Sequence, residues 1–289
     1  MLKYFPVIIF LGFACLSCNI KNPKEPTPTY IHIDSFTMVD NPKVIPPKLS
    51  LSNQIAAVYV YYNNNPIGYF DLPATFPVIT NGRGQIKVFP AIAVDGLNNF
   101  MATYPFYAAD TLTFDPQPGA IIKMAAKTRY HDSTKHYLNY SFSSFGTVSF
   151  TLLNGTVPIT TTTEPANIFE GTGSGLISLH LPLDTLSESK SFDPFNVPVG
   201  VDAYIELNYK STVPFYIGLR ANLNGSTTYY QRYLSGINPS DKWQKFYLAI
   251  KDFAAQYKGD YYDLYIKASL PAGVTSGTVL IDNVQFVYF

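Results

Sequence analysis

Apolar and polar residues alternate along many short segments of this chain. The alternation has a period of two over residues 55–62, 203–210 and 263–270, for example. In an extended strand a period of two places every second side chain on the same face, so each segment predicts a strand with one buried face. Strands are predicted in this way over residues 31–39, 55–62, 85–94, 147–153, 176–183, 203–210, 214–223, 245–250, 263–270 and 278–289.

Helical patterns are rare in comparison. Only residues 251–258, KDFAAQYK, favour a helix, and that helix is about two turns long. Runs rich in Asn, Gly and Pro separate the strand segments and predict turns, which fall at residues 63–66, 81–84, 223–226 and 272–273. The pattern therefore predicts an all-β fold.

Length and composition refine this prediction. The 289 residues include 23 Tyr, 21 Phe, 22 Pro and 18 Gly, and only 14% are charged, against about 25% in an ordinary soluble domain. Aromatic residues favour strands, and Pro and Gly favour turns. A chain of this length predicts one large or two medium domains, each with its own core and without disulfides. With 20 basic and 20 acidic residues, the chain lacks the basic excess of a nucleic-acid-binding protein.

The two cysteines lie close together near the N-terminus. Residues 1–13, MLKYFPVIIFLGF, have the basic start and short apolar run of a secretory signal. The apolar run is too short for a membrane-spanning helix of about 20 residues. The LSC tripeptide that ends at Cys18 resembles the bacterial lipobox, in which cleavage leaves an acylated cysteine at the new N-terminus. We therefore expect a signal peptide over residues 1–17, lipidation of Cys18 and a flexible tether over residues 18–29.

Two other interpretations of these cysteines stay open. Cleavage before Cys15 would make that residue the anchor, and a Cys15–Cys18 disulfide would suit a secreted protein without an anchor. With Cys18 acylated, the membrane is a partner through the acyl chains, and we expect a lipid-anchored outer-membrane protein. We favour the cell surface over the periplasmic face, although residues 19–26 lack the acidic run that often follows the cysteine of surface-exported lipoproteins.

Two domains are expected to follow the tether. The first, residues 30–128, is predicted to be a small N-terminal β-sandwich. Within it, residues 58–92 contain a strand, an Asn-rich turn, a second strand, a Leu-Pro-Ala step and a third strand. This layout resembles the small β-sandwich domains called PEGA-like. The matching residues are Val58, Val60, Pro66, Ile67, Gly68, Leu72, Pro73, Gly84, Ile86 and Val88.

The second domain, residues 136–289, carries a different resemblance. The end of the chain, SGTVLIDNVQFVYF, and the segment DKWQKFYLAIKDF at residues 241–253 resemble strands of the galactose-binding-like jelly rolls, which include many carbohydrate-binding modules. The resemblance implies a C-terminal jelly-roll β-sandwich. The whole chain, with its segments Leu72–Val78 and Tyr104–Tyr107, resembles uncharacterised lipoproteins of Bacteroidetes-type bacteria.

The jelly-roll resemblance also implies a candidate metal site. In many such jelly rolls the Asp of the final strand, here Asp282, helps to hold a structural Ca²⁺ together with a Glu from a Phe-Glu step. The only Phe-Glu step in this chain is Phe169-Glu170, which departs from the usual position near the start of the domain. Calcium prefers six to eight oxygen ligands, so the alternative is that Asp282 hydrogen-bonds a neighbouring turn. No other cofactor is expected.

Familiar catalytic motifs do not occur in the sequence. It has no Gly-x-Ser-x-Gly elbow, P-loop or His-Glu-x-x-His motif. His131, Asp132 and His136 form a cluster, but their spacing fits neither a helix-borne nor a strand-borne metal site. We therefore expect a solvated loop there, with a metal site or catalysis as the alternatives, and we do not expect an enzyme.

Aromatic side chains are the candidates for ligand binding. Glycan-binding jelly rolls usually stack sugars on exposed rings, which makes Trp243, Tyr229 and Tyr261 candidates. The alternative for Trp243 is a packing role at the edge of the sandwich. In a strand, one ring of each adjacent pair, Tyr229–Tyr230 and Tyr261–Tyr262, must face outward, and such a ring also suits a protein interface.

These observations favour a non-catalytic, lipid-anchored outer-membrane protein that acts as an accessory or interaction subunit of an envelope complex. The alternative is a carbohydrate-binding lipoprotein that assists glycan capture. An enzyme is a third possibility, but no pair of convergent carboxylates stands out among the 20 acidic residues.

Overall fold

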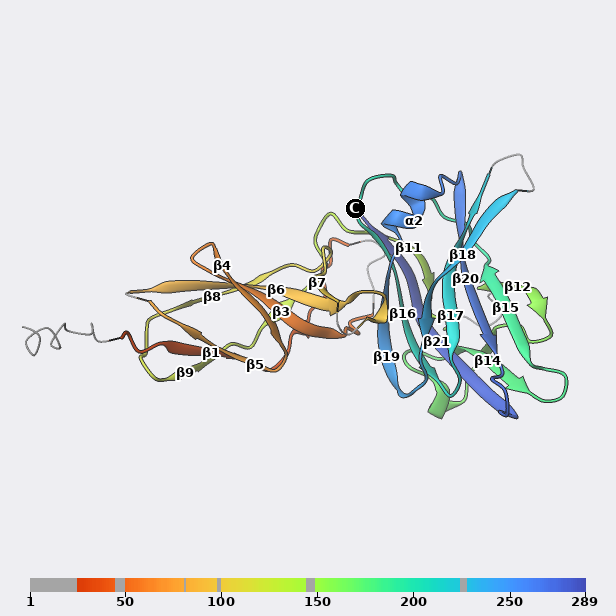
Figure 1. Cartoon of the computed structure of the whole chain (residues 1–289), viewed down its shortest axis with the longest axis horizontal. Helices are drawn as coiled ribbons and strands as arrows, with labels where there is room; N and C mark the ends of the chain where they lie inside the picture. The colour runs from red at the N-terminus through yellow and green to blue at the C-terminus, as the bar shows by residue number, and fades with distance from the viewer. Residues whose placement is uncertain (1–24, 45–49, 81, 98–99, 144–148, 224–227) are drawn as a thin grey trace, which may run out of the picture.

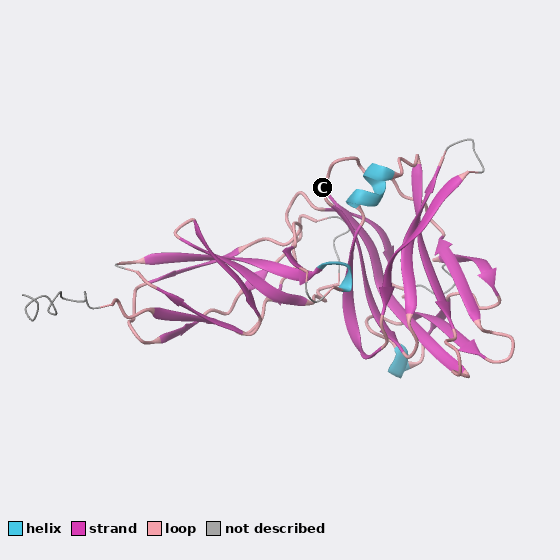
Figure 2. Ribbon diagram, viewed as in Figure 1, coloured by secondary structure: helices cyan, strands magenta, loops and turns pink. Residues whose placement is uncertain are grey.

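The computed structural model describes residues 25–44, 50–80, 82–97, 100–143, 149–223 and 228–289. In these residues the chain forms strands, short 3-10 turns and one α-helix, α2 (Lys251–Gln256), so the predictions of an all-β fold and of a single short helix are confirmed. Two lobes lie side by side along the long axis of the molecule (Figure 1), and strands dominate both (Figure 2). No helix among the described residues is long and apolar enough to cross a membrane.

The N-terminal lobe contains three sheets. One has the order β4-β3-β6-β7 with β8 beside β6, the second has the order β5-β1-β9, and the third pairs β10 with β2. The elements are β1 (Thr29–Ile33), β2 (Thr37–Met38), β3 (Ile55–Tyr62), β4 (Asn65–Asp71), β5 (Ala74–Val78), β6 (Gly84–Ala93), η2 (Val94–Gly96), β7 (Met101–Thr103), β8 (Asp110–Phe114), β9 (Ile121–Lys123) and β10 (Lys127–Thr128).

Residues 31–39 were expected to form one strand, and this prediction is wrong. The segment forms β1 and β2 instead, because the chain changes partners between them: β1 pairs with β5 and β9, whereas β2 pairs with β10. Alternate side chains of the strands still form one core, in which each fully buried aliphatic or aromatic side chain contributes about 1.5–3 kcal/mol. This core consists of Ile31, Ile33, Phe36, Val58, Val60, Ala74, Phe76, Val78, Ile86, Val88, Phe114, Met124 and Ala126.

The C-terminal lobe is a β-sandwich of two sheets. The six-stranded sheet has the order β13-β14-β21-β16-β19 with β11 beside β21, and the five-stranded sheet has the order β12-β15-β20-β17-β18. The elements are β11 (Lys135–Tyr140), β12 (Phe150–Gly155), β13 (Thr160–Thr162), η3 (Pro165–Asn167), β14 (Ser174–His180), β15 (Leu186–Ser191), β16 (Ala203–Ser211), β17 (Phe215–Asn222), β18 (Tyr229–Ile237), β19 (Ser240–Ala249), α2, β20 (Tyr261–Ser269) and β21 (Ser276–Tyr288).

The final strand, β21, is buried on both of its faces. Ile281 and Phe286 belong to the core between the two sheets, whereas Val287 belongs to a separate cluster against the N-terminal lobe. A strand that is covered on both faces needs apolar residues at successive positions. This burial explains why the apolar run at the C-terminus shows little alternation.

The N-terminal lobe covers part of the outer face of the six-stranded sheet. At the centre of the contact, Lys245 Nζ lies 2.6 Å from Glu206 Oε2, and both side chains are fully buried. Tyr130 of the N-terminal lobe donates a 2.8 Å hydrogen bond to the same carboxylate. We call the following residues the junction cluster: Tyr104, Tyr107, Tyr130, Glu206, Lys245, Tyr247 and Gln285.

The junction cluster lowers the pKa of its buried carboxyl. Burial by itself raises the pKa of Glu206, but the charge of Lys245 and the hydrogen bonds from the phenols outweigh burial and hold the pKa below its ordinary value of 4.5. Glu206 is therefore ionised and paired with Lys245 at neutral pH.

The prediction that His136 lies in a solvated loop is wrong. His136 belongs to β11, its ring is half-buried, and its Nδ1 lies 3.2 Å from Gln285 Oε1. The ring also meets that of Tyr130 edge-on at 4.7 Å. The predicted solvent exposure does hold for His131 and Asp132. The difference arises because the N-terminal lobe packs against the side of β11 that carries His136.

Candidate functional site

The outer face of the five-stranded sheet differs from its inner face in carrying charged and amide side chains and exposed tyrosines. In β17, Phe215, Ile217, Leu219 and Ala221 point into the core, so the residues that alternate with them point outward. Antiparallel pairing places Asn222 of β17 opposite both Tyr229 of β18 and Tyr261 of β20. We call this surface the tyrosine face, and its residues are Glu188, Lys190, Tyr216, Arg220, Asn222, Tyr229, Gln231, Tyr233, Tyr261, Asp263, Tyr265 and Lys267.

Polar side chains on the tyrosine face form a connected series of contacts. The buried carboxylate of Asp263 accepts a hydrogen bond from Lys190 Nζ and another from Asn222 Nδ2, each at 3.0 Å. Asn222 Oδ1 accepts a hydrogen bond from Arg220 Nε at 3.1 Å. The Arg220 guanidinium in turn lies 3.5 Å from the ring centroid of Tyr229. These contacts hold the ring of Tyr229 in place through a cation–π interaction.

Three tyrosines from three neighbouring strands form a second group on this face. The ring centroid of Tyr233 lies 5.4 Å from that of Tyr216 and 5.2 Å from that of Tyr265. The Tyr265 hydroxyl lies 2.9 Å from that of Tyr233 and donates to the carboxylate of Glu188. Tyr216 and Tyr233 remain 46% and 42% exposed, whereas Tyr265 is buried. The two exposed rings therefore rest on a buried, hydrogen-bonded one.

The buried tyrosine is held in its neutral form. Burial, reinforced by the hydrogen bond to Glu188, raises the pKa of the Tyr265 hydroxyl well above its usual range. Tyr265 thus remains protonated and donates to Glu188 at any physiological pH. Its contact with the ring of Tyr233 therefore does not change with pH.

Gly218 allows β18 to approach β17 closely at this point. The pairing register shifts at Gly218, so that Tyr233 lies opposite it and the extra residue, Leu234, packs against the core. A Cβ atom on Gly218 would clash with the carbonyl oxygen of Arg232 and lie 2.8 Å from Tyr233 Cα. Only glycine fits there. The resulting β-bulge turns Tyr233 onto the outer face.

The tyrosines that the sequence indicated lie on or beside this face. Tyr229 and Tyr261 belong to it and are 45% and 37% exposed, while Tyr262 is buried, as alternation in a strand requires. Tyr230 is as exposed as Tyr229, so this pair does not divide between the two sides. The reason is that β18 is an edge strand of its sheet, where Tyr230 packs against the ring of Tyr257 at 5.3 Å and stays exposed.

A hollow of about 450 Å³ adjoins the tyrosine face at Tyr261. Aromatic rings from the six-stranded sheet, those of Tyr137 and Tyr288, contribute to its walls, and Asn196 supplies an amide. The hollow therefore extends the aromatic surface from the tyrosine face around the end of the sandwich.

Trp243 does not join this group. It lies in β19, an edge strand of the opposite, six-stranded sheet. The ring is half-buried and packs against Phe169, with 5.2 Å between the ring centroids. These contacts suit the packing role that was the alternative for this residue.

The two candidate metal ligands, Asp282 and Glu170, do lie close together. The buried Asp282 carboxylate accepts hydrogen bonds from Ser174 Oγ at 2.8 Å, from the Asn283 N–H at 2.7 Å and from the Glu170 N–H at 3.4 Å. The Asn283 side-chain amide donates to Glu170 Oε2 at 3.0 Å. Burial raises the pKa of Asp282 to about 6, although these hydrogen bonds oppose the shift.

This arrangement does not fit a calcium ion. Calcium prefers six to eight oxygen ligands, whereas the oxygens of Asp282 face O–H and N–H donors, and an amide N–H₂ of Asn283 lies against Glu170. Across the described ranges, no group of three or more His, Cys, Asp or Glu residues is placed to hold a metal ion. The contacts correspond to the alternative, in which Asp282 hydrogen-bonds a neighbouring turn.

The sequence contained a signal for residues that we did not single out. Tyr216 and Arg220 fall at the polar phase of the predicted strand 214–223, and Asp263 and Tyr265 fall at the polar phase of strand 263–270. Alternation in each strand would have turned these residues toward solvent, whereas the pairing of β17 with β20, which brings them onto one surface, is known only from the structure. Cys18, the predicted lipidation site, lies outside the described residues.

Comparisons with known proteins find similarity in structure but not in sequence. No protein-family model matches the chain, and a search of curated proteins finds no match. A carbohydrate-binding-module structure from the β-sandwich superfamily aligns with a TM-score of 0.41 at 12% identity, over 91% of this chain and 99% of that chain.

Two further structures align over about half of the chain. The family 22 xylan-binding domain from Paenibacillus barcinonensis has a TM-score of 0.38 at 19% identity, over 52% of this chain and 92% of its own. The family 11 carbohydrate-binding module of a Clostridium thermocellum cellulosomal cellulase has a TM-score of 0.36 at 11% identity, over 52% of this chain and 93% of its own.

Proposed function

We propose that this chain is a carbohydrate-binding protein and that the tyrosine face binds the glycan. The observation that carries the proposal is the exposure of Tyr216, Tyr229 and Tyr233, three rings on one sheet face that a hydrogen bond and a guanidinium contact hold in position. A pyranose ring has an apolar face of C–H groups and a polar rim of hydroxyl groups. Fixed aromatic rings beside charged and amide side chains complement both parts.

The charges on the face indicate which glycans suit it. Lys190 is paired with Asp263 at 3.0 Å, and Lys267 Nζ lies 3.9 Å from a Glu188 oxygen. Because these cations already have carboxylate neighbours, we expect a neutral polysaccharide to bind better than a strongly acidic one. The paired side chains are also ordered before binding, which limits the entropy that binding loses.

Binding of soluble xylan, mixed-linkage glucan and mannan, measured by affinity gel electrophoresis and calorimetry, tests this proposal. The wild type is expected to bind at least one of them, and Tyr216→Ala and Tyr233→Ala are each expected to weaken that binding about tenfold or more. Tyr69→Ala is a matched control, because Tyr69 is 48% exposed but lies on the N-terminal lobe. Trp243→Ala is expected to retain binding. Undiminished binding by a Tyr216→Ala, Tyr233→Ala double variant would reject the proposal.

A lipid anchor at Cys18 would suit this role. The described chain starts at the end of the molecule that lies far from the jelly roll (Figure 1). With acyl chains on Cys18, the N-terminal lobe would act as a spacer that holds the tyrosine face away from the membrane. We therefore propose the cell surface as its location, and protease treatment of whole cells tests which side of the membrane it faces.

A second candidate function, docking to an envelope protein, is favoured by four rings on the solvent face of β3, β4 and β6. Tyr59 and Tyr69 stack at 4.4 Å, Tyr61 meets Tyr59 edge-on at 5.0 Å, and Phe89 meets Tyr61 at 5.5 Å. These rings cover one another's faces, so they offer a sugar less flat surface than the rings of the tyrosine face do. Aromatic side chains are typical of protein interfaces, so this group suits a protein partner better. Cross-linking in whole cells tests this role, and Tyr69→Ala is expected to reduce any specific product.

A further inference from the structure

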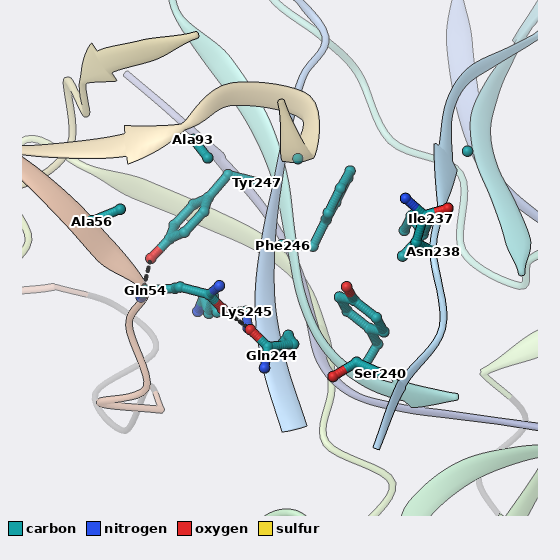
Figure 3. A pocket seen from close by; sticks show the side chains of 13 residues that line it. Gln54, Ala56, Ala93, Ile237, Asn238, Ser240, Gln244, Lys245, Phe246 and Tyr247 are labelled. Atoms are coloured by element: carbon teal, nitrogen blue, oxygen red, sulfur yellow. Dashed lines mark hydrogen bonds between the residues drawn. The ribbon is translucent and has the colours of Figure 1, made fainter. Parts of the chain in front are cut away.

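A pocket of about 280 Å³ lies where the two lobes meet (Figure 3). Gln54 and Gly96 of the N-terminal lobe line one part of it, and Asn238, Gln244 and Phe246 of the jelly roll line another. None of the described residues that line it belongs to the tyrosine face. We call it the seam pocket.

Several polar groups in the seam pocket have no hydrogen-bond partner among the residues that the structure describes. In the part of the chain that the structure describes, the side-chain amides of Asn238 and Gln244 and the hydroxyl of Tyr209 make no hydrogen bond. Gln54 accepts a hydrogen bond at its Oε1, and its amide N–H₂ group has no acceptor among the described residues. Polar groups in a pocket are satisfied by water or by a ligand. The seam pocket therefore offers three amides and a phenol to a ligand with its own donors and acceptors.

Contacts between the lobes hold this pocket in shape. Gln54 is fixed at two points, because its N–H donates to the Tyr247 hydroxyl at 3.1 Å and its Oε1 accepts the Lys245 N–H at 2.7 Å (Figure 3). Elsewhere in the lining, Gly96 lies so close to Phe246 that a Cβ atom would be 2.7 Å from the ring. A pocket with walls ordered in this way needs little rearrangement on binding.

The charge and shape of the seam pocket restrict the ligand. The one charged lining residue, Lys245, is buried and paired with Glu206 at 2.6 Å, so the pocket presents no unpaired charge from the described residues. The rings of Tyr209 and Phe246 meet edge-on, with centroids 6.4 Å apart, and supply apolar surface. The volume of about 280 Å³ lies just below the range of about 300–1,000 Å³ that is usual for ligand pockets. A small, neutral ligand with hydroxyl groups and an apolar face fits these features.

We infer that the seam pocket binds a single neutral sugar unit. The amides and the phenol would hydrogen-bond its hydroxyl groups, and the rings of Tyr209 and Phe246 would pack against its C–H groups. Because both lobes line the pocket, the bound sugar would also strengthen their contact. This site is separate from the tyrosine face and does not depend on the function proposed for that face.

Titration of the full chain with D-glucose, D-galactose, D-mannose and N-acetyl-D-glucosamine tests the inference. Two-dimensional NMR follows the side-chain amide signals of Gln54, Asn238 and Gln244 directly. At least one sugar is expected to shift these signals in a saturable way. Gln244→Ala and Asn238→Ala are each expected to weaken that sugar's binding about tenfold, through the loss of one or two hydrogen bonds.

A matched control separates the pocket from general effects. Gln256→Ala removes an exposed glutamine from α2 and is expected to leave binding unchanged. The inference is overturned if none of the four sugars shifts the amide signals, or if binding survives both Gln244→Ala and Asn238→Ala. It is also overturned if Tyr233→Ala abolishes monosaccharide binding and Gln244→Ala does not. Polysaccharide binding that is lost in Tyr233→Ala alone would support the tyrosine face whatever the seam pocket binds.

Discussion

Tyr104 of the N-terminal lobe donates a 2.5 Å hydrogen bond to Glu206 of the jelly roll, and both side chains are buried. The same carboxylate is paired with Lys245 at 2.6 Å. A buried charge loses its hydration and needs compensation from neighbouring groups. For Glu206 part of that compensation comes from the other lobe, so separating the two lobes would leave the charge without these hydrogen bonds.

Replacing either of two neighbouring tyrosines by Phe tests how much the hydrogen bond to the buried Glu206 carboxylate contributes to the free energy of unfolding. Tyr104→Phe removes a hydrogen bond to a buried carboxylate and is expected to lower the free energy of unfolding by about 1.5–3 kcal/mol. Tyr107→Phe removes a neutral hydrogen bond, the 3.1 Å contact with the Tyr247 hydroxyl, and is expected to cost about 1 kcal/mol. Urea denaturation measures both. Equal losses would contradict a special role for the buried charge.

The jelly roll expressed without the N-terminal lobe is expected to fold. The described residues of its core run from Tyr140 to Phe286, so a fragment of residues 136–289 retains them. The fragment exposes Glu206 and Lys245 to water and loses the phenols that cover them. We therefore expect a cooperative thermal transition at a lower temperature than in the full chain. A fragment without a cooperative transition, measured by circular dichroism, would mean that the two lobes share one folding unit.

Strands in which apolar and polar residues alternate could be predicted from the sequence. Strands that turn polar residues toward the core could not. Strand β16, for example, places Ile205 and Leu207 in the core at a period of two. Strand β15 instead buries Ser187 and Ser189 and turns Glu188 outward. Because no apolar residue marks its inner face, alternation did not predict a strand over this segment. The bulge in β18 interrupts the period of that strand in the same way.

The contact between the two lobes could not be predicted from the sequence for a different reason. Glu206 and Lys245 lie at the polar phase of their strands, the phase that in a single sandwich faces water. Only the packing of the second lobe makes them buried. That packing depends on residues distant in sequence, among them Tyr104 and Tyr130, and no local pattern in the chain reports it. The seam pocket, which the same packing creates, could not be predicted either.

Asp282 is expected to give the stability a characteristic pH dependence. Its pKa is about 6 in the folded protein, against an ordinary value of 3.8. Between these values the folded state binds more protons than the unfolded state, so the contribution of Asp282 to stability is greatest at low pH and is lost as the pH rises through 6. Asp282→Asn removes this dependence. The free energy of unfolding of the variant, measured by urea denaturation relative to that of the wild type, should therefore increase by on the order of 2–3 kcal/mol from pH 4 to pH 7.

If the difference in the free energy of unfolding between Asp282→Asn and wild type stays constant with pH, the raised pKa of Asp282 is contradicted. Calcium provides a second check on the same residue. A cation bound only by the folded state would raise the melting temperature as its concentration increases. Because Asp282 faces hydrogen-bond donors, we expect neither calcium nor a chelator to shift the thermal transition of the wild type.

Cys18→Ala tests the predicted lipid anchor. Acylation at this cysteine supplies the apolar chains that hold the protein in the membrane, each buried methylene contributing about 0.8 kcal/mol. The variant is therefore expected to accumulate as unprocessed precursor or to leave the membrane fraction, as detergent-phase partitioning of cell extracts would show. Cys15→Ala is the matched control and is expected to be processed normally. Normal cleavage and membrane association of Cys18→Ala would exclude the anchor.

Gly218→Ala is expected to damage the tyrosine face more than the rest of the molecule. The added methyl group clashes with the carbonyl oxygen of Arg232 and with Tyr233 Cα, so the backbone of β18 must move away from β17. Such overpacking costs about 1–3 kcal/mol, and it displaces the exposed ring that the bulge turns outward. We expect a lower melting temperature together with polysaccharide binding that is about tenfold weaker. Gly82→Ala, where a Cβ atom meets nothing within 4 Å, is the matched control and should change neither property. If Gly218→Ala lowers stability but binds polysaccharide like wild type, the glycan does not contact Tyr233, and the tyrosine face is not the binding surface.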